Sequence, residues 1–318
     1  MARLDITFGR PELRAVKKAA LRRDLPALGA VLTAGLAGPD DHIERVRVAA
    51  DTLTEWTGKS VPEGLDDWVR DDPDNPTALV VRGAVEINRA WEVRGRLQAR
   101  YTKPQQLLDF ISILGNAEAY CRAAAQSDPG DAAPWLFLLS MARGQQVGTD
   151  EVVRRRDELE ARAPQSFVGH RHAIAALGPQ WGGSMQAVDK QVRTWTAEAP
   201  AGSLLPALVF VAGIQRWWSH GHRRAFARDP ERRAQAYRAS GLLPMQPCQT
   251  PDEFLAHNHA AAWYALSREP KRANDHFKLL RGHVTEYPWR DLLARSIRQG
   301  PVPLFRGKRV NALLRLPF

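Results

Sequence analysis

The sequence predicts an all-α protein in which two-helix units repeat along the chain. Three prolines, Pro129, Pro164 and Pro200, lie 35 and 36 residues apart, and each follows a short polar run and precedes an apolar helical pattern and then a more charged one. Apolar residues recur at helical spacing through most of the chain, whereas strand-like alternation never extends over more than a few residues. These observations predict an array of helical repeats, an α-solenoid, in which each unit buries its apolar face against the next.

Residues 1–72 are expected to form an N-terminal helical cap. Pro11 is placed to be the first residue of one helix, and Asp24 is placed to cap a second. The turn at 38–40 ends the second helix and precedes a third, and a short helix follows near Trp68.

A linker of turn-forming residues at 71–76, with two prolines, three aspartates and an asparagine, separates this cap from the repeats. Two helices follow, from Thr77 to about Arg96 and from Pro104 to the turn before Pro129. The second helix carries a stripe of apolar residues at helical spacing, namely Leu107, Leu108, Ile111, Leu114 and Cys121. Cys121 is expected to be a small core residue.

Further two-helix units follow at 131–163, 165–199, 203–240 and 250–287. In the third of these units, Asp229 is placed to cap a helix that begins at Pro230. The predicted domains are therefore the helical cap of residues 1–72, the helical repeats of residues 73–287, and a basic C-terminal helix and proline-containing tail of residues 288–318.

The unit at 250–287 has small and aromatic residues at four characteristic positions. Counted from Phe254 as position 1, positions 8, 11, 20 and 24 are Ala261, Tyr264, Ala273 and Phe277. This pattern resembles the tetratricopeptide repeat, in which the small residues let two helices approach and the bulky ones fill the groove between units. The resemblance implies a right-handed array. His257 stands at position 4 in place of the family's tryptophan, and the terminal proline comes late, at Pro288.

A second resemblance lies in the segment 177–184, whose Trp-Gly-Gly-Ser turn is similar to that of a group of uncharacterised actinobacterial tetratricopeptide-like proteins. It covers about residues 75–290, implies the fold, and brings no activity or catalytic residue with it. In physical terms, Gly182 and Gly183 predict a sharp turn, and Ser184 predicts the cap of the following helix.

The bulk composition is that of an ordinary globular chain. Of 318 residues, 44% are hydrophobic and 25% charged, and the longest apolar run, 204–214, is too short to span a bilayer. The first residues lack the basic-then-apolar layout of a signal peptide, so we expect a cytoplasmic protein without membrane contact. The two cysteines form neither a disulfide framework nor a metal motif, and no cofactor is expected.

Positive charge is concentrated in the second half of the chain. Residues 1–150 contain 19 lysines and arginines against 21 acidic residues, whereas residues 151–318 contain 26 against 14. This asymmetry predicts an acidic partner, either protein or nucleic acid. The candidate basic patch for nucleic acid is Arg223, Arg224, Arg228, Arg232 and Arg233. The competing interpretation is an exposed helix whose arginines pair with Asp229 and Glu231.

Three His-x-His pairs raise the alternative of a His-based, possibly metal-dependent enzyme. The pairs are His170 with His172, His220 with His222, and His257 with His259. Residues two apart point in nearly opposite directions on a helix, whereas metal pairs on helices use an i,i+4 spacing, so packing or solvation is the default interpretation. No phosphate loop, dinucleotide fingerprint, zinc motif or nucleophile elbow is present in the sequence.

The leading hypothesis is a non-enzymatic scaffold that binds a protein or peptide segment in the concave groove of residues 130–290. In the tetratricopeptide register, the groove-facing positions of the last unit include Leu255, Asn258 and Ala262. An asparagine there can hold a peptide backbone or carboxylate. Trp217 is a further candidate anchor, and its alternative role is to close the core at a helix end.

Overall fold

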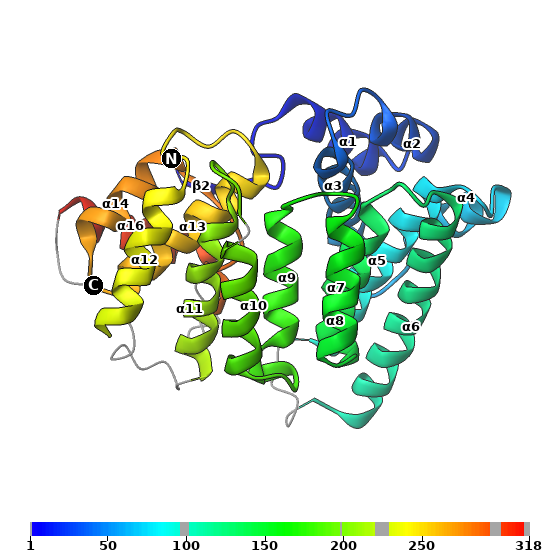
Figure 1. Ribbon diagram of the computed structural model, residues 1–318. Coiled ribbons are helices and arrows are strands. Elements are labelled where there is room, and N and C mark those ends of the chain that lie inside the picture. The colour runs from blue at the N-terminus through cyan, green and yellow to red at the C-terminus, as the bar shows by residue number, and fades with distance from the viewer. Residues whose placement is uncertain (1, 96–101, 198, 220–228, 293–299, 315–318) are drawn as a thin grey trace. The chain divides into compact units, whose positions relative to one another are not determined.

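Helices account for nearly all of the regular structure, so the predicted all-α class is confirmed (Figure 1). The computed structural model describes residues 2–95, 102–197, 199–219, 229–292 and 300–314. Within these ranges the strands are two short segments, β1 (Arg3–Leu4) and β2 (His283–Val284), which pair in parallel. No helix in the described part of the chain is long and apolar enough to cross a membrane.

The chain divides by its internal contacts into two compact units. The N-terminal unit is Gly9–Pro164, and the C-terminal unit is Gln165–Phe318 together with Met1–Phe8. The predicted division into cap, repeats and tail therefore differs from the compact units, and it stays a prediction. The physical reason is packing: helices of the predicted cap pack on the first predicted repeats within one unit, and the C-terminal helix packs on the last repeat in the other.

The N-terminal unit begins with the predicted caps. Pro11 is the first residue of the first helix, and the Asp24 carboxylate accepts a hydrogen bond from the backbone of Ala27 at the start of the second. The helices are α1 (Pro11–Arg22), α2 (Leu25–Thr33), α3 (Pro39–Thr57), α4 (Leu65–Asp71), α5 (Pro76–Arg94), α6 (Pro104–Ser127), α7 (Ala133–Gln145) and α8 (Thr149–Glu160).

Helices α5 and α6 form the most extensively packed pair of this unit, and Gly83 marks their closest approach. A Cβ at Gly83 would lie 2.6 Å from the Cys121 sulfur. Cys121 is buried as expected, and burial raises the pKa of its thiol to about 12. The predicted stripe on α6 is wrong in part, because Leu108 and Ile111 are 62% and 61% exposed. The helix buries a different face, namely Phe110, Leu114, Ala117, Cys121 and Ala124.

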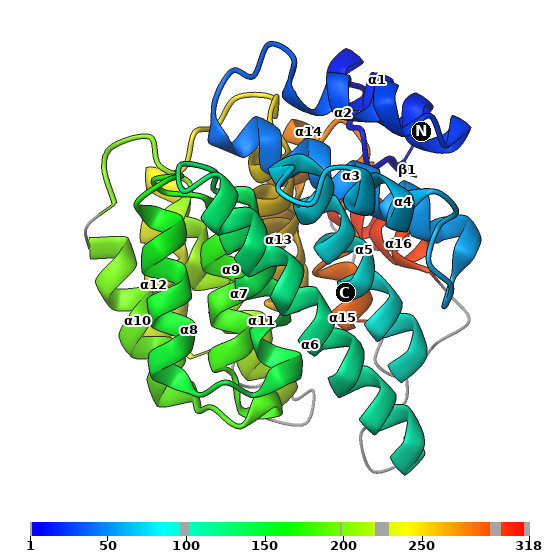
Figure 2. The same cartoon turned by 90° about the vertical axis from the view of Figure 1, so that its right-hand side faces the viewer.

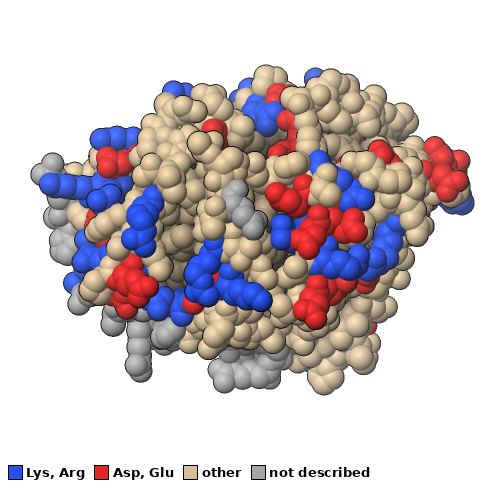
Figure 3. Space-filling model, viewed as in Figure 1, with Lys and Arg blue, Asp and Glu red and all other residues tan. Residues whose placement is uncertain are grey.

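A buried arginine ties three helices of this unit together. Arg155 on α8 is 2% exposed and donates to Glu118 on α6 at 2.9 Å, to Glu151 at 2.7 Å and to the Leu138 carbonyl oxygen on α7 at 2.7 Å. Hydrogen bonds from Arg154 and Arg155 lower the pKa of Glu151 to about 2. Figure 3 shows acidic and basic side chains next to one another over α7 and α8, which is the pattern of a paired, solvated surface.

The C-terminal unit contains the other predicted two-helix units and the end of the chain. Its helices are α9 (Phe167–Leu177), α10 (Met185–Ala197), α11 (Leu208–Ser219), α12 (Pro230–Leu242), α13 (Pro251–Leu266), α14 (Pro270–Leu279), α15 (Trp289–Leu292) and α16 (Pro301–Leu313), with short 3-10 turns at Pro179–Trp181 and Leu205–Ala207. Two predicted caps are present: the Ser184 hydroxyl accepts from the Ala187 backbone, and the Asp229 carboxylate accepts from the Glu231 backbone. Gly183 is required at its turn, because a Cβ there would lie 2.0 Å from the Leu177 carbonyl oxygen.

The core of this unit lies around α13 and is closed by the two ends of the chain. Phe277 stacks on Trp289, and Phe305 meets both rings edge to face, with ring centroids 5.0 to 5.9 Å apart; all three side chains are fully buried. Phe8, just before the first helix of the chain, stacks on Phe254 at 4.9 Å. The expected basic tail is therefore wrong for residues 301–313, which form a packed helix because Phe305 anchors them in this core.

Candidate functional site

A run of buried polar side chains along α13 is the most unusual feature of the C-terminal unit. The helix is capped by Thr250, whose hydroxyl accepts from the Glu253 backbone while Glu253 reaches back to the Thr250 backbone. His257, Asn258 and His259 follow, and they are 1%, 0% and 3% exposed. They are enclosed because α13 contacts α9, α11, α14, α16 and β2. Polar groups so deeply buried must find their partners inside the protein.

His257 and His276 form a direct pair across the α13–α14 hairpin. The His257 Nε2 lies 3.1 Å from the Pro244 carbonyl oxygen, which can only accept, so this nitrogen carries the proton. The Nδ1 of the neutral His257 is then an acceptor, and it receives the Nδ1 proton of His276 at 2.8 Å. The geometry thus fixes complementary tautomers for the two rings.

The hydrogen-bonded chain continues from His276 to a serine and a tyrosine. Ser240 Oγ lies 3.4 Å from His276 Nε2 and 2.8 Å from the Tyr264 hydroxyl, and its single proton is donated to one of these two acceptors at a time. Tyr264 donates its own proton to the Ala236 carbonyl oxygen at 2.9 Å. Burial raises the pKa of Tyr264 to about 12, so the phenol stays protonated at neutral pH.

Burial also keeps the histidines of this region uncharged. It lowers the pKa of His257, and it lowers the pKa of both His259 and His276 to about 3. Among the described residues, no group of three His, Cys, Asp or Glu side chains is placed to hold a metal ion. The buried chain is therefore a neutral hydrogen-bonded network that joins α12, α13 and α14.

At the surface, α12, α14 and the turn between α13 and α14 form a charged edge that we call the basic rim, consisting of Arg233, Tyr237, Arg268, Glu269, Lys271 and Arg272. Tyr237 donates to Glu269 at 2.7 Å, and this hydrogen bond raises the pKa of the phenol. Arg233 and Arg272 approach the same carboxylate at 3.3 and 3.5 Å. Arg272 also lies 3.9 Å from the centre of the Tyr237 ring.

Stacked aromatic rings connect the basic rim to the buried network. Tyr237 stacks on Tyr264 with an interplanar angle of 16°, and Tyr264 stacks on His276 with an angle of 12°. Arg272 at the surface, the two tyrosines and His276 thus form one continuous column that joins the rim to the buried network.

Asn258 does hold a peptide backbone, but the backbone belongs to its own chain. Its side-chain nitrogen donates to the carbonyl oxygens of Phe254 at 2.8 Å and His283 at 3.3 Å. Its side-chain oxygen accepts from the Trp289 indole at 2.6 Å. With 0% exposure and all three hydrogen bonds made internally, this side chain fixes the segment after α14 onto α13.

The other predicted groove residues also lie away from an open groove. Leu255 is half-buried, Ala262 is 0% exposed, and Trp217 is 8% exposed. Trp217 thus takes its alternative placement, in the core near the end of α11. The structure does not bring these residues together on an accessible concave surface, because the neighbours of α13 cover it from several sides.

His170, from the first predicted histidine pair, lies in the interior of the C-terminal unit. His170 is 2% exposed, its Nδ1 lies 2.8 Å from the Ser166 carbonyl oxygen, and its ring meets the edge of Trp195. His220 and His222 lie outside the described residues. His257 occupies the inter-helix position that the tetratricopeptide register gives it, whereas its partner His276 was not predicted. The available signal was that His276 directly precedes Phe277, a core position of the same register.

Of the predicted basic patch, Arg232 and Arg233 are described, and both approach acidic groups. Arg232 lies 3.9 Å from Asp229, and Arg233 pairs with Glu269. Arg223, Arg224 and Arg228 lie outside the described residues.

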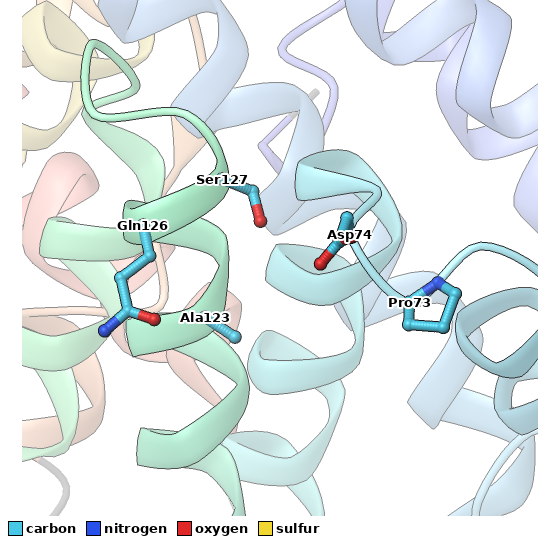
Figure 4. A pocket seen from close by; sticks show the side chains of 5 residues that line it. All are labelled: Pro73, Asp74, Ala123, Gln126 and Ser127. Carbon is cyan, nitrogen blue, oxygen red and sulfur yellow. The ribbon is translucent and has the colours of Figure 1, made fainter.

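A hollow of about 360 Å³ is present in the N-terminal unit, open to solvent (Figure 4). It lies between the turn before α5 and the last turn of α6. Asp74 and Ser127 extend into it from opposite sides, and Pro73, Ala123 and Gln126 complete the lining. Its shallow, largely polar lining lacks the enclosed apolar character of a typical small-molecule site.

Comparison with known proteins gives no match: no protein-family model, no curated protein and no solved structure matches the chain. An interpretation of its function therefore starts from the buried network, the basic rim and the surfaces of the two units.

Proposed function

We propose that the chain is a tetratricopeptide-like helical scaffold that binds an acidic segment of another protein at the basic rim. The observation that carries this proposal is the pair of exposed cations at the rim, Arg268 and Lys271, which have no acidic partner among the described residues. Beside them, Arg233 and Arg272 already hold one carboxylate, that of Glu269. Figure 3 shows basic side chains predominating over acidic ones above α12 and α14.

The packing of the last repeat supports the tetratricopeptide-like part of the proposal. Ala261, Tyr264, Ala273 and Phe277, the four residues of the register, are all 0% exposed. Tyr264 contacts Phe210 of the preceding helix pair at 5.5 Å, and Phe277 contacts Trp289 of the following segment. Small residues within the hairpin and aromatic residues between neighbouring pairs are what the repeat requires.

The proposal keeps the class of partner expected from the sequence and changes the surface. The groove positions on α13 are interior, so an acidic ligand would meet the outer edge of α12 and α14 instead. A guanidinium can hold a carboxylate with two parallel hydrogen bonds. The cation–π contact with Tyr237 and the ion pair with Glu269 also hold Arg272 in place before a ligand arrives, which reduces the entropy lost on binding.

No specific observation favours either alternative function, nucleic-acid binding or a His-based enzyme. The described arginines of the predicted nucleic-acid patch are partnered by carboxylates, and the buried histidines are neutral and inaccessible to a substrate. Both alternatives remain hypotheses from the sequence.

The experiment is fluorescence anisotropy with a labelled glutamate-rich peptide and its glutamine counterpart. The double variant Arg268→Glu with Lys271→Glu should bind the acidic peptide roughly tenfold more weakly, because two attractive charges become repulsive at an exposed site. The matched control is Arg14→Glu with Lys18→Glu, which reverses two exposed cations on α1 and changes the net charge equally. Affinity for the acidic peptide should also fall with added salt.

Equal loss of affinity in the two double variants would contradict the proposal, because it would reduce the effect to net charge. Equal affinity of the wild-type chain for the glutamate and glutamine peptides would contradict it as well.

A further inference from the structure

Two arginines of the basic rim approach one carboxylate in the same way, through their Nε atoms. Arg233 Nε lies 3.3 Å from one oxygen of Glu269, and Arg272 Nε lies 3.5 Å from the other. Both distances exceed the roughly 2.8 Å of a charge-assisted hydrogen bond. Arg233 Nε and Glu269 Oε1 are buried and make no hydrogen bond within the described chain. Glu269 therefore balances part of the charge of the two arginines but satisfies few of their donors.

The carboxylate is more deeply buried than the two guanidinium groups that approach it. The Glu269 side chain is 12% exposed, whereas those of Arg233 and Arg272 are 37% and 45% exposed. The terminal nitrogens of both arginines make no hydrogen bond with a described residue. Two neighbouring guanidinium groups thus keep their terminal N–H donors available for an acceptor from outside the chain.

Stacked rings support one of these guanidinium groups from below. The Arg272 guanidinium carbon lies 3.9 Å from the centre of the Tyr237 ring and 6.0 Å from that of Tyr264. Helix α13, which contains Tyr264, lies between α9 and α16 in the interior of the unit (Figure 2). The planar fork of Arg272 therefore has a defined direction before a ligand binds.

We infer that the acidic segment bound at the basic rim contains a phosphorylated serine or threonine. Its phosphate accepts hydrogen bonds from the terminal nitrogens of Arg233 and Arg272. Arg268 and Lys271, which are exposed on either side of Glu269 in the sequence, pair with acidic residues next to the phosphorylated one. This inference rests on the proposed function and names the chemistry of its ligand.

Charge and donor geometry favour a phosphate over a second carboxylate. The rim contains four cations and one carboxylate, which leaves a net charge of +3. A phosphate monoester carries about −1.5 to −2 charges at pH 7 and offers three acceptor oxygens, whereas a carboxylate carries one charge and offers two oxygens. Two guanidinium groups side by side can bind one phosphate through different oxygens, which is how arginine clusters recognise phosphorylated motifs.

Fluorescence anisotropy with three labelled peptides tests the inference. The peptides share one acidic sequence and differ at a central position, which is serine, glutamate or phosphoserine. The phosphoserine peptide should bind the wild-type chain about tenfold more tightly than the glutamate peptide, and the serine peptide should bind most weakly. Inorganic phosphate, equimolar with the phosphoserine peptide, should not displace it, because the flanking acidic residues also contribute to binding.

A variant with both arginines replaced by lysine tests the assignment to the guanidinium groups. Arg233→Lys combined with Arg272→Lys keeps both charges and removes both forks, so the glutamate and phosphoserine peptides should bind it with roughly equal affinity. The variant should stay folded, because both side chains are partly exposed. The matched control is Arg193→Lys with Arg238→Lys, which changes two exposed arginines of α10 and α12 outside the rim and should keep the tenfold preference.

Equal affinity of the wild-type chain for the phosphoserine and glutamate peptides would overturn the inference and leave the proposed function intact. Failure of all three peptides to bind would overturn both. A phosphoserine preference that persists in the double lysine variant, or that is lost equally in the control, would also overturn the inference, as would displacement of the peptide by equimolar inorganic phosphate.

Discussion

At the scale of single residues, the buried histidines of α13 and α14 are defined by their lack of charge. His257 and His276 share one proton between their two Nδ1 atoms. Protonation of either ring would put a proton on both Nδ1 atoms and break this hydrogen bond. His259 is enclosed in the same way and donates to the Leu255 carbonyl oxygen at 2.8 Å. Protonation and folding are therefore in competition at these sites.

This competition predicts a loss of stability in mild acid. The pKa values of His259 and His276 are about 3 in the folded chain and 6.5 in the unfolded chain, so the unfolded chain binds more protons between these values. The free energy of unfolding should therefore be greatest above pH 6.5. It should decrease as the pH falls toward 3, by up to about 1.4 kcal/mol per pH unit for each histidine.

Urea unfolding followed by circular dichroism at a series of pH values measures this slope. His259→Gln removes one titrating group and should make the slope shallower. An identical slope in the variant and the wild-type chain would show that His259 is not linked to folding.

At the scale of elements, Asn258 determines how the segment after α14 is attached. The sequence predicted that Asn258 lines a groove, but its side chain bonds within the chain. β2 supplies a backbone carbonyl oxygen and α15 supplies an indole, which are the partners that a ligand would otherwise provide. The helix α13 is therefore a central core element of its unit.

Asn258→Ala should destabilise the fold by about 3 kcal/mol, because the Trp289 indole and the His283 carbonyl oxygen lose a buried partner. Chemical denaturation measures this change. Asn274→Ala, on the half-exposed surface of α14, is the matched control and should change stability by less than about 0.5 kcal/mol. A fully stable Asn258→Ala protein with weakened peptide binding would instead support the groove role expected from the sequence.

Helix starts were predictable from the sequence because capping is local chemistry. Asp24, Ser184 and Asp229 each accept a backbone hydrogen bond at the helix start where the sequence placed a cap. The buried face of α6 was not predictable in the same way. Apolar residues lie on two sides of that helix, and periodicity alone does not show which side meets α5 and which side, with Leu108 and Ile111, remains exposed.

At the scale of the whole molecule, the sequence did not show which segments of the chain make up the C-terminal unit. The unit combines the last half of the chain with its first eight residues, through the pairing of β1 with β2 and the stacking of Phe8 on Phe254. Strands of two residues leave no pattern that a sequence window can detect. The partners of Asn258 could not be predicted either, because two of them, His283 and Trp289, follow it by 25 and 31 residues.

The charge asymmetry, in contrast, was visible in the composition. Part of the excess positive charge lies in the basic rim. There Arg268 and Lys271 are close in sequence to Glu269, whose carboxylate already pairs with Arg233 and Arg272. In the proposed function this surface attracts an acidic partner at long range, and Arg272 and Tyr237, which already contact each other, orient the bound segment.

Hydrogen–deuterium exchange with and without the glutamate-rich peptide tests most directly whether the basic rim is the binding surface. Binding there should slow exchange in α12 and in the first turn of α14, and it should leave α1 unchanged, including the exposed Arg14 and Lys18. Slowed exchange elsewhere, with α12 and α14 unaffected by a bound peptide, would contradict the proposed site. The absence of any change at saturating peptide would contradict the proposed function.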